Sequence, residues 1–457
     1  MTRGIKKSLI ALAISGVFAA PSAFATNGYF AHGYSTKEKG LAGAGVAHSQ
    51  DAMAIATNPA GIAGMGERMD IGAAIFSPLR SYNVSGAPAP GFGPGGPTFS
   101  LDEGNVDSNL DYFFIPHFAY NWSLDNNSSV AVAVYGNGGM NTNYKGGGAT
   151  YFDGAQFVNT PGTFGAGTTG VNLAQLFINL SYATKITENH SVGAGLVFAY
   201  QTFEAKGLAT FSPFSSSPGN LTNNDADASS GFGIKLGWQG KVASDITLGA
   251  SYQSKLAMSE FDDYAGLFAE QGDFDIPATA TLGLAWKTSK SSTLVFDIQQ
   301  IYYSDVDALS NSISQLGTAC VPAGSPNNPV PPQQGGSGQG PGCLGAAAGA
   351  GFGWDDMTIF KLGYEWGNDT IWRVGISQGD QPIPSSEVLF NLLAPAVMET
   401  HLTFGLTVPI GSDSEFSFAG MYAPKKSLSG ANPFDPGQTI EIEMVQYEVQ
   451  ATYSMKF

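Results

Sequence analysis

Two cysteines carry the most reactive side chains of the sequence, and their placement limits what they can do. Cys320 and Cys343 lie in one stretch rich in proline and glycine. Neither has a histidine or another cysteine at the spacing of a metal site. In an exported chain such a pair is expected to form a disulfide, which would close residues 321–342 into a loop. A metal site or a nucleophile is the disfavoured alternative, and the sequence predicts no cofactor.

Histidine chemistry has little support in this sequence. The chain has five histidines, and it contains no Gly-x-Ser-x-Gly elbow, His-Glu-x-x-His motif or phosphate-binding loop. A hydrolase needs a nucleophile, a base and an orienting acid, and candidate bases such as His117 and His190 have no such partners nearby in the sequence. We therefore expect no enzymatic activity.

Basic residues suggest a third kind of chemistry, which is the binding of a carboxylate. Lys361 and Arg373 fall on the polar face of alternating segments, and His401 is a weaker candidate. Acidic residues such as Glu365 and Glu399 leave a second interpretation open, namely that these cations form structural ion pairs. The elements that carry these residues decide what they face.

Residues 445–457 alternate strictly between apolar and polar side chains, with Val445 and Phe457 at the two ends of the apolar set. Such alternation predicts a strand with two different faces, and about 9–11 residues suffice to cross a membrane. Upstream, Ile440, Ile442 and Met444 occupy the opposite parity, which we interpret as the strand leaving the bilayer. The apolar face could meet lipid or a soluble core.

The amino terminus predicts export. Basic residues precede the apolar run 8–20, and an Ala-x-Ala site ends at Ala25, so residues 1–25 are predicted to be a cleaved signal peptide. Cleavage removes three basic residues, which changes the formal net charge from −17 to −20. This charge argues against nucleic acid as a partner.

Composition and periodicity together predict a barrel in a membrane. The chain has 60 glycines and only 12% charged residues, so small and aromatic residues replace charge. Alternating runs predict fourteen strands, at 67–83, 109–122, 129–143, 172–186, 190–206, 228–242, 245–260, 274–288, 291–305, 354–367, 369–380, 398–410, 414–425 and 438–457.

The connections between these strands alternate between short, polar turns and long loops. The long loops are predicted at 84–108, 144–171, 207–227, 261–273, 306–353, 381–397 and 426–437. An up-and-down antiparallel barrel in the outer membrane of a Gram-negative bacterium requires this alternation, because its two rims face different compartments. The fold class is therefore all-β, with a barrel over 67–457, and a soluble sandwich is the alternative.

Residues 26–66 lack strand alternation. They are rich in alanine and glycine, and Asn58, Pro59 and Ala60 end a short helical stretch. A cylinder of fourteen strands is wider than its own side chains can fill. We predict that 26–66 form a plug inside the barrel, and a flexible tail is the alternative.

These features resemble a known family. Phe30, the Gly-Leu-Ala-Gly-Ala-Gly stretch at 40–45, the Asn-Pro-Ala-Gly stretch at 58–61, Asn432-Pro-Phe and the final Phe457 are similar to the FadL/TodX family of outer-membrane channels for hydrophobic substrates. The resemblance implies a fourteen-stranded barrel with an N-terminal hatch. It also implies passive uptake: capture in an extracellular groove, passage to a lumenal pocket and lateral release through the wall.

Site residues follow from this resemblance. For the groove we predict apolar loop residues, and for the inner pocket the residues after the cleavage site and a lumenal cation. The predicted ligand-binding residues are Leu267, Phe268, Leu389, Phe390, Thr26, Asn27, Gly28, Phe30, Lys361 and Arg373. The loop residues could instead be loop cores that pack on the barrel rim.

A lateral opening is predicted where the third strand becomes rich in glycine, at Tyr135, Gly136, Gly138 and Gly139, because glycine weakens strand pairing. The alternative is that the strand simply ends there.

Long-chain fatty acids are the expected cargo, with aromatic or alkane hydrocarbons as the alternative. An outer-membrane barrel enzyme of lipase or protease type and an adhesive barrel are functions of other classes. Expected partners are outer-membrane lipid, lipopolysaccharide and the barrel assembly machinery, which would recognise Phe457, and a monomer is expected.

Overall fold

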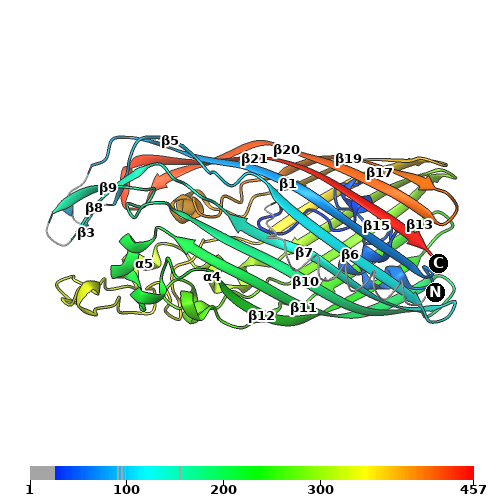
Figure 1. The fold of residues 1–457 in the computed structure, drawn as a ribbon, viewed down its shortest axis with the longest axis horizontal. Helices are drawn as coiled ribbons and strands as arrows, with labels where there is room; N and C mark the ends of the chain where they lie inside the picture. Colours follow the sequence, from blue (N-terminus) through cyan, green and yellow to red (C-terminus); the bar gives the residue numbers. More distant parts are fainter. Residues whose placement is uncertain (1–25, 90–91, 94–95, 98, 154–155) are drawn as a thin grey trace.

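The protein folds as a closed antiparallel barrel (Figure 1). The structure, a computed structural model, describes residues 26–89, 92–93, 96–97, 99–153 and 156–457. Within these residues fourteen strands pair with their neighbours, and pairing of β11 with both β10 and β12 closes the ring. The predicted fold class is confirmed. The predicted signal peptide, residues 1–25, lies outside the described residues.

The barrel strands correspond one to one with the fourteen predicted runs. They are β1 (Arg68–Ser85), β6 (Phe113–Ser123), β7 (Ser128–Asn141), β10 (Gly170–Lys185), β11 (His190–Lys206), β12 (Asp227–Lys241), β13 (Ile246–Gln253), β15 (Thr279–Ser289), β16 (Ser292–Ile301), β17 (Met357–Gly367), β18 (Ile371–Gly379), β19 (Thr400–Ile410), β20 (Ser414–Asn432) and β21 (Asp435–Lys456). Strands β1 and β21 pair along their whole common length, from Arg68 beside Lys456 to Ser85 beside Thr439.

Short turns join the strands at the rim where β21 ends, and long loops project from the other rim (Figure 1). The long loops contain β2 (Phe92–Gly93), β3 (Gly96–Pro97), β4 (Ser100–Leu101), β5 (Gly104–Asp107), β8 (Gly148–Phe152), β9 (Phe157–Pro161), η3 (Ala209–Phe214), η4 (Pro218–Asn220), β14 (Ala257–Met258), η5 (Asp262–Tyr264), α3 (Ala269–Gly272), η6 (Tyr303–Asp305), α4 (Asp307–Ser310), α5 (Gln315–Thr318), η7 (Pro332–Gln334), η8 (Ser385–Glu387) and α6 (Val388–Asn391).

One predicted long loop, 426–437, is wrong. Strands β20 and β21 continue through it and pair until Asn432 lies beside Asp435. The sequence alternates weakly here because this hairpin extends past the apolar belt, where neither face needs a lipid-facing set of side chains. The run 245–260 was predicted too long, since β13 stops at Gln253 and only β14 continues the pairing.

Apolar side chains cover the outside of the barrel. Exposed examples come from strands all around the ring: Ile75, Leu180, Leu196, Phe232, Leu282, Phe360, Leu402 and Val449. Their exposure is the reverse of a soluble protein and matches a wall that faces lipid. No helix in the described residues is long and apolar enough to cross a membrane.

The interior changes character along the barrel axis. Near the short-turn rim β21 presents buried polar residues such as Glu448 and Gln450 to the inside. Higher up, Ile440, Ile442 and Met444 face inward and join a large apolar core under the extracellular loops. The shift in parity noted in the sequence is therefore a change of lumen lining, since the register of β21 with β1 is unbroken.

Residues 26–66, called the N-terminal segment below, contact strands on opposite sides of the barrel. The segment contains α2 (Thr36–Lys39), η1 (Ala52–Ala56) and η2 (Pro59–Ile62). Helix α2 contacts β19, β20 and β21, whereas η2 contacts β10, β11 and β12. These contacts agree with a plug, and the division of the chain at 25/26 and 66/67 stays a prediction.

Candidate functional site

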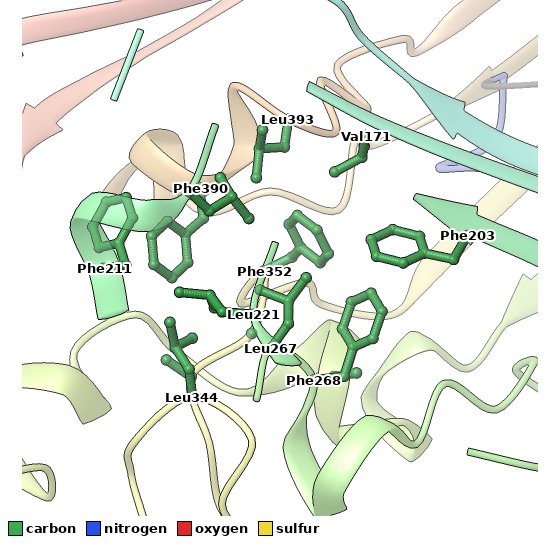
Figure 2. Close-up of a pocket in the computed structure, with 14 residues that line it drawn as sticks. Val171, Phe203, Phe211, Leu221, Leu267, Phe268, Leu344, Phe352, Phe390 and Leu393 are labelled. Carbon is green, nitrogen blue, oxygen red and sulfur yellow. The ribbon is translucent and has the colours of Figure 1, made fainter. Parts of the chain in front are cut away.

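An apolar cavity lies between the extracellular loops and the loop-side ends of β10 and β11 (Figure 2). Its lining residues are Val171, Phe203, Leu208, Phe211, Leu221, Leu267, Phe268, Ala308, Leu344, Ala350, Gly351, Phe352, Phe390 and Leu393. The volume is about 30 Å³, whereas an apolar cavity that holds benzene measures roughly 150 Å³. A ligand must therefore displace side chains to enter.

Five phenylalanine rings contribute to the cavity wall, and they come from β11 and from several loops. Phe203, near the end of β11, lies 4.7 Å from Phe268 between ring centroids, and Phe211 of η3 lies 5.3 Å from Phe390. The Tyr264 hydroxyl donates to the Asp225 carbonyl at 2.6 Å and accepts from the Ala205 amide at 3.0 Å. These bonds hold the Phe268 loop against β11.

A buried amide fixes two further walls. Asn391, at the end of α6, donates from its Nδ2 to the Phe352 carbonyl at 2.8 Å, and its Oδ1 accepts from the Trp354 indole at 2.7 Å. Because Asn391 is fully buried, an unbonded amide there would cost free energy, so these bonds fix the helix to the 352–354 stretch. Phe390 and Phe352 are thereby held on facing sides.

A disulfide joins Cys320 and Cys343, whose Cα atoms are 4.7 Å apart. The residue after it, Leu344, lines the cavity, and its amide donates to the Phe214 carbonyl at 3.0 Å. The disulfide thus closes a smaller loop within residues 302–356, and the Leu344–Phe214 bond holds that part beside the cavity.

Three of the four predicted groove residues meet in this cavity, namely Leu267, Phe268 and Phe390. Leu389 is also buried but does not line it. The sequence reasoning missed Phe203 and Phe211. Phe203 lies on the inward-facing side of β11, so the alternation of that strand could have identified it. Phe211 lies in a 3-10 helix, where the sequence has no periodicity to indicate which side chains face inward.

The pairing of β6 with β7 is interrupted. Among the described residues the two strands pair only from Ser123 beside Ser129 to Phe118 beside Val134. Pairing resumes farther up in the loops, where Ser108 bridges to Tyr144. Residues 110–117 and 135–142 therefore border a gap in the hydrogen-bond ladder of the wall, called the β6–β7 gap below.

A bulge in β7 lies at this gap. Gly138 lies beside Gln175 of β10 and Gly136 beside Leu176, so Asn137 is one extra residue. Its carbonyl accepts from the Ala31 amide at 2.9 Å, and its Oδ1 accepts from the Tyr34 hydroxyl at 2.8 Å. The N-terminal segment thus supplies partners that β6 does not. The predicted opening residues, Tyr135, Gly136, Gly138 and Gly139, surround Asn137, which the sequence reasoning missed.

Close backbone approach explains one of the glycines. Gly138 bridges to Phe30, and a Cβ on Gly138 would lie 2.2 Å from the Tyr29 carbonyl oxygen. The amide of Gly139 donates to the same oxygen at 3.2 Å. A side chain at 138 would push the N-terminal segment away from β7.

The predicted residues at the start of the mature chain form one tight turn beside this contact. Asn27 and Phe30 exchange backbone hydrogen bonds of 3.0 and 3.2 Å, and the Thr26 hydroxyl donates to the Phe30 carbonyl at 2.6 Å. Gly28 takes a positive φ of 64° against the Tyr303 ring. The Asn27 side-chain amide is buried without a hydrogen-bond partner in the described part of the chain.

Both predicted lumenal cations are engaged. Arg373 pairs with Glu365 at 2.8 Å and donates to Gln50 and Thr407, each at 2.7 Å. Lys361 donates from Nζ to the carbonyl oxygens of His32 and Gly43, at 3.1 and 3.4 Å. Their role in binding a carboxylate stays a prediction, and the alternative of an ion pair describes the contacts of Arg373.

The Asn58-Pro59-Ala60 turn packs tightly against the wall. Asn58 donates to the carbonyl oxygens of Val46 at 2.7 Å and Trp238 at 2.9 Å, and its Oδ1 accepts from the Ala60 amide at 3.0 Å. A Cβ on Gly237 of β12 would lie 2.0 Å from that Oδ1, so the glycine makes room for the turn.

Comparison with known proteins gives the family. The sequence matches the profile of the outer membrane protein transport family (OMPP1/FadL/TodX) over residues 16–378. The chain belongs to this family. It is accordingly a channel for hydrophobic substrates in the outer membrane of Gram-negative bacteria. A comparison with curated proteins found no significant match.

Solved structures of OMPP1/FadL/TodX relatives share the fold. The toluene transporter TodX of Pseudomonas putida is 16% identical, with a TM-score of 0.63, and the match covers 93% of this chain and 99% of that one. The toluene transporter TbuX of Ralstonia pickettii is 16% identical, with a TM-score of 0.59 and the same coverage. A Pseudomonas aeruginosa FadL homologue is 13% identical, with a TM-score of 0.63, covering 94% and 100%.

Proposed function

We propose that the protein takes up hydrophobic molecules passively, by capture in the apolar cavity and lateral release through the β6–β7 gap. The cavity offers aromatic walls near the outer face, where apolar surface attracts a poorly soluble molecule. The N-terminal segment acts as the hatch, because it bonds to strands on opposite sides and blocks a straight passage. The turn at Thr26, Asn27, Gly28 and Phe30 belongs to the inner pocket.

The interrupted ladder between β6 and β7 carries this proposal. A molecule that leaves through the wall enters lipid directly and never crosses the aqueous lumen. Buried apolar side chains line both inner sides of the gap, with Phe113 and Ile115 on β6 and Tyr135 and Met140 on β7. A break in a membrane barrel leaves polar backbone groups without ladder partners, so its presence needs a compensating gain.

Long-chain fatty acids are the proposed cargo. An acyl chain matches aromatic walls that have no charged residue among them. Aromatic or alkane hydrocarbons are the second candidate, which the toluene transporters TodX and TbuX favour by their fold. Mass spectrometry of ligand that copurifies with the barrel would separate the two.

Deletion of Asn137 tests the lateral route. Without this residue β7 has no bulge, so its pairing with β10 keeps a single register along the strand. We expect β7 then to continue its hydrogen-bond ladder with β6, which would close the gap. Channel-dependent uptake of radiolabelled oleate by cells should then fall to the level of cells without the protein. The folded barrel is checked by its heat-dependent migration on a gel.

Deletion of Thr288 is the matched control. It removes the extra residue of another bulge, between Lys287 and Ser289 in the β15–β16 hairpin, far from the gap in the order of strands. Uptake should stay at the wild-type rate. Normal uptake after deletion of Asn137, with a folded barrel, would exclude the lateral route.

A further inference from the structure

A buried cation lies inside the β6–β7 gap. Arg80 projects inward from β1, is 4% exposed, and places its guanidinium carbon 5.6 Å from the centroid of the Phe113 ring. One of its Nη atoms donates to the carbonyl oxygen of Asn141, at the end of β7. The other donates to the carbonyl oxygen of Leu110, which precedes β6. The guanidinium therefore joins the two sides of the gap, an arrangement called the Arg80 clamp below.

The electrostatic setting of Arg80 differs from that of the lower lumen. Four buried cations there form ion pairs: Lys37 and Arg68 with Glu415, Lys39 with Glu448, and Arg373 with Glu365. In the described part of the chain no carboxylate lies within ion-pairing distance of Arg80, and Asp111 influences it only from farther away. Its charge is met by two neutral carbonyl groups.

Two other lumenal cations also have no ion pair among the described residues, but their surroundings are polar. Lys235 and Lys361 donate to backbone carbonyl groups and line a polar cavity that also contains Asp297. Arg80 instead lies beside the apolar core, with Phe113 against its guanidinium. A charge in such surroundings attracts an opposite charge strongly, because the dielectric screening is weak.

Unused donors at the clamp point to a ligand. The Nε of Arg80 and the hydroxyl of Tyr144 are both buried and have no hydrogen-bond partner among the described residues. Tyr144 packs edge-on against Tyr82, which lies two residues along β1 from Arg80, at 5.0 Å between ring centroids. A guanidinium and a hydroxyl are the donors that a carboxylate accepts from.

We propose that Arg80 and Tyr144 bind the carboxylate of a hydrophobic molecule at the gap, and that this binding opens the clamp. The carboxylate oxygens replace the carbonyl oxygens of Asn141 and Leu110 as acceptors, and the two sides of the gap separate. A neutral molecule has no anionic group to make this exchange, so it should open the clamp less often and be taken up more slowly. The inference rests on the proposed function and narrows the cargo to apolar molecules with a carboxylate.

The test compares two probes of equal chain length that differ in the head group, radiolabelled oleate and oleyl alcohol. Channel-dependent initial uptake is measured in cells with the full-length protein, and cells without it give the background. For Arg80→Gln the ratio of oleate to oleyl alcohol uptake should fall about tenfold, since the variant loses a charge-assisted hydrogen bond. Tyr144→Phe should lower the same ratio about threefold, since it loses one neutral hydrogen bond.

Lys425→Gln is the control for loss of a cation. Lys425 is exposed on the extracellular part of β20, which β21 and β1 separate from β6, and it pairs with Glu443 at 2.6 Å. This variant should keep the wild-type ratio. If Arg80→Gln does not give a folded barrel, Tyr144→Phe decides, because it leaves the clamp bonds intact.

The outcomes separate this inference from the proposed function. An unchanged ratio in the folded variants, or an equal loss in the uptake of both probes, would contradict the proposal that Arg80 and Tyr144 recognise the carboxylate. If the wild type takes up oleyl alcohol but not oleate, this inference is wrong and the proposed function still stands. No channel-dependent uptake of either probe by the wild type would refute the proposed function.

Discussion

The β20–β21 pair and the β6–β7 pair respond differently to the same kinds of irregularity. Strand β20 contains Pro424 and a bulge, yet it pairs with β21 from Ser414 to Asn432. Strand β6 contains Pro116, β7 contains a bulge, and their pairing stops after six residues. A proline or a bulge is therefore not enough to open the wall.

The side to which the displaced backbone turns explains the difference. In β20 the bulged Lys425 is exposed and pairs with Glu443 on the neighbouring strand, so the strands stay together. In β7 the bulged Asn137 bonds to Ala31 and Tyr34 of the N-terminal segment. An interior partner thus competes with β6 for β7, and the gap depends on that partner.

Glycine substitution should give the largest contrast between the two pairs. Gly138→Val places a side chain where a Cβ would already lie 2.2 Å from the Tyr29 carbonyl oxygen. We expect a loss of about 1–3 kcal/mol in the free energy of unfolding, as for other overpacked sites. Trypsin cleavage at Lys37 and Lys39 should become faster.

Gly420→Val is the matched change in the β20–β21 pair. The nearest atom to a Cβ on Gly420 is the Glu448 carbonyl oxygen, at 3.9 Å. Denaturant unfolding and trypsin cleavage of this variant should match the wild type. Equal effects at the two glycines would show that the N-terminal segment does not press on β7.

Hydrogen exchange should distinguish the pairs without any mutation. Amides of 113–117 and 135–141 lack part of their ladder, so we expect them to exchange at least about tenfold faster than amides of 414–422 and 446–455. Mass spectrometry of peptides from these ranges measures the difference. Equal protection would mean that the gap is bridged by bonds that the ladder does not include.

A tyrosine pair gives the smallest expected effect. Tyr34→Phe removes the 2.8 Å hydrogen bond to Asn137, and Tyr453→Phe removes a 2.9 Å bond to Ser414. Each bond is worth about 1 kcal/mol, which is roughly a fivefold change in local opening. Exchange of the β7 amides should quicken in Tyr34→Phe alone. Faster exchange of β7 in both variants would point to a general loosening of the barrel.

Much of the barrel follows from the sequence, because lipid imposes strict alternation on every strand that crosses it. The prediction failed at 426–437, where the hairpin extends past the lipid and its outward residues include Ser427 and Ser429. The lipid environment is thus what produces the alternating pattern in the sequence. Outside the membrane the sequence does not distinguish a turn from a strand, and only the pairing of the strands in the structure does.

The site was less predictable than the fold. Leu267 and Phe268 were found because an apolar run in a polar loop is unusual. Asn137 could not be singled out among the neighbouring glycines, since a bulge is defined by its partner strand, β10. Arg80 did carry a signal, because it shares the inward parity of β1 with Phe76 and Tyr82, where a lone cation is out of place.

The occupied edge of β7 has a consequence for how copies of this protein behave beside one another. An unpaired strand edge invites a strand from another molecule, which leads to domain exchange or aggregation. Here Tyr29 and Ala31 of the same chain already bond to that edge, and Pro116 lacks an amide hydrogen on the opposite side. The wall can therefore have a gap without offering neighbouring molecules a free edge to pair with.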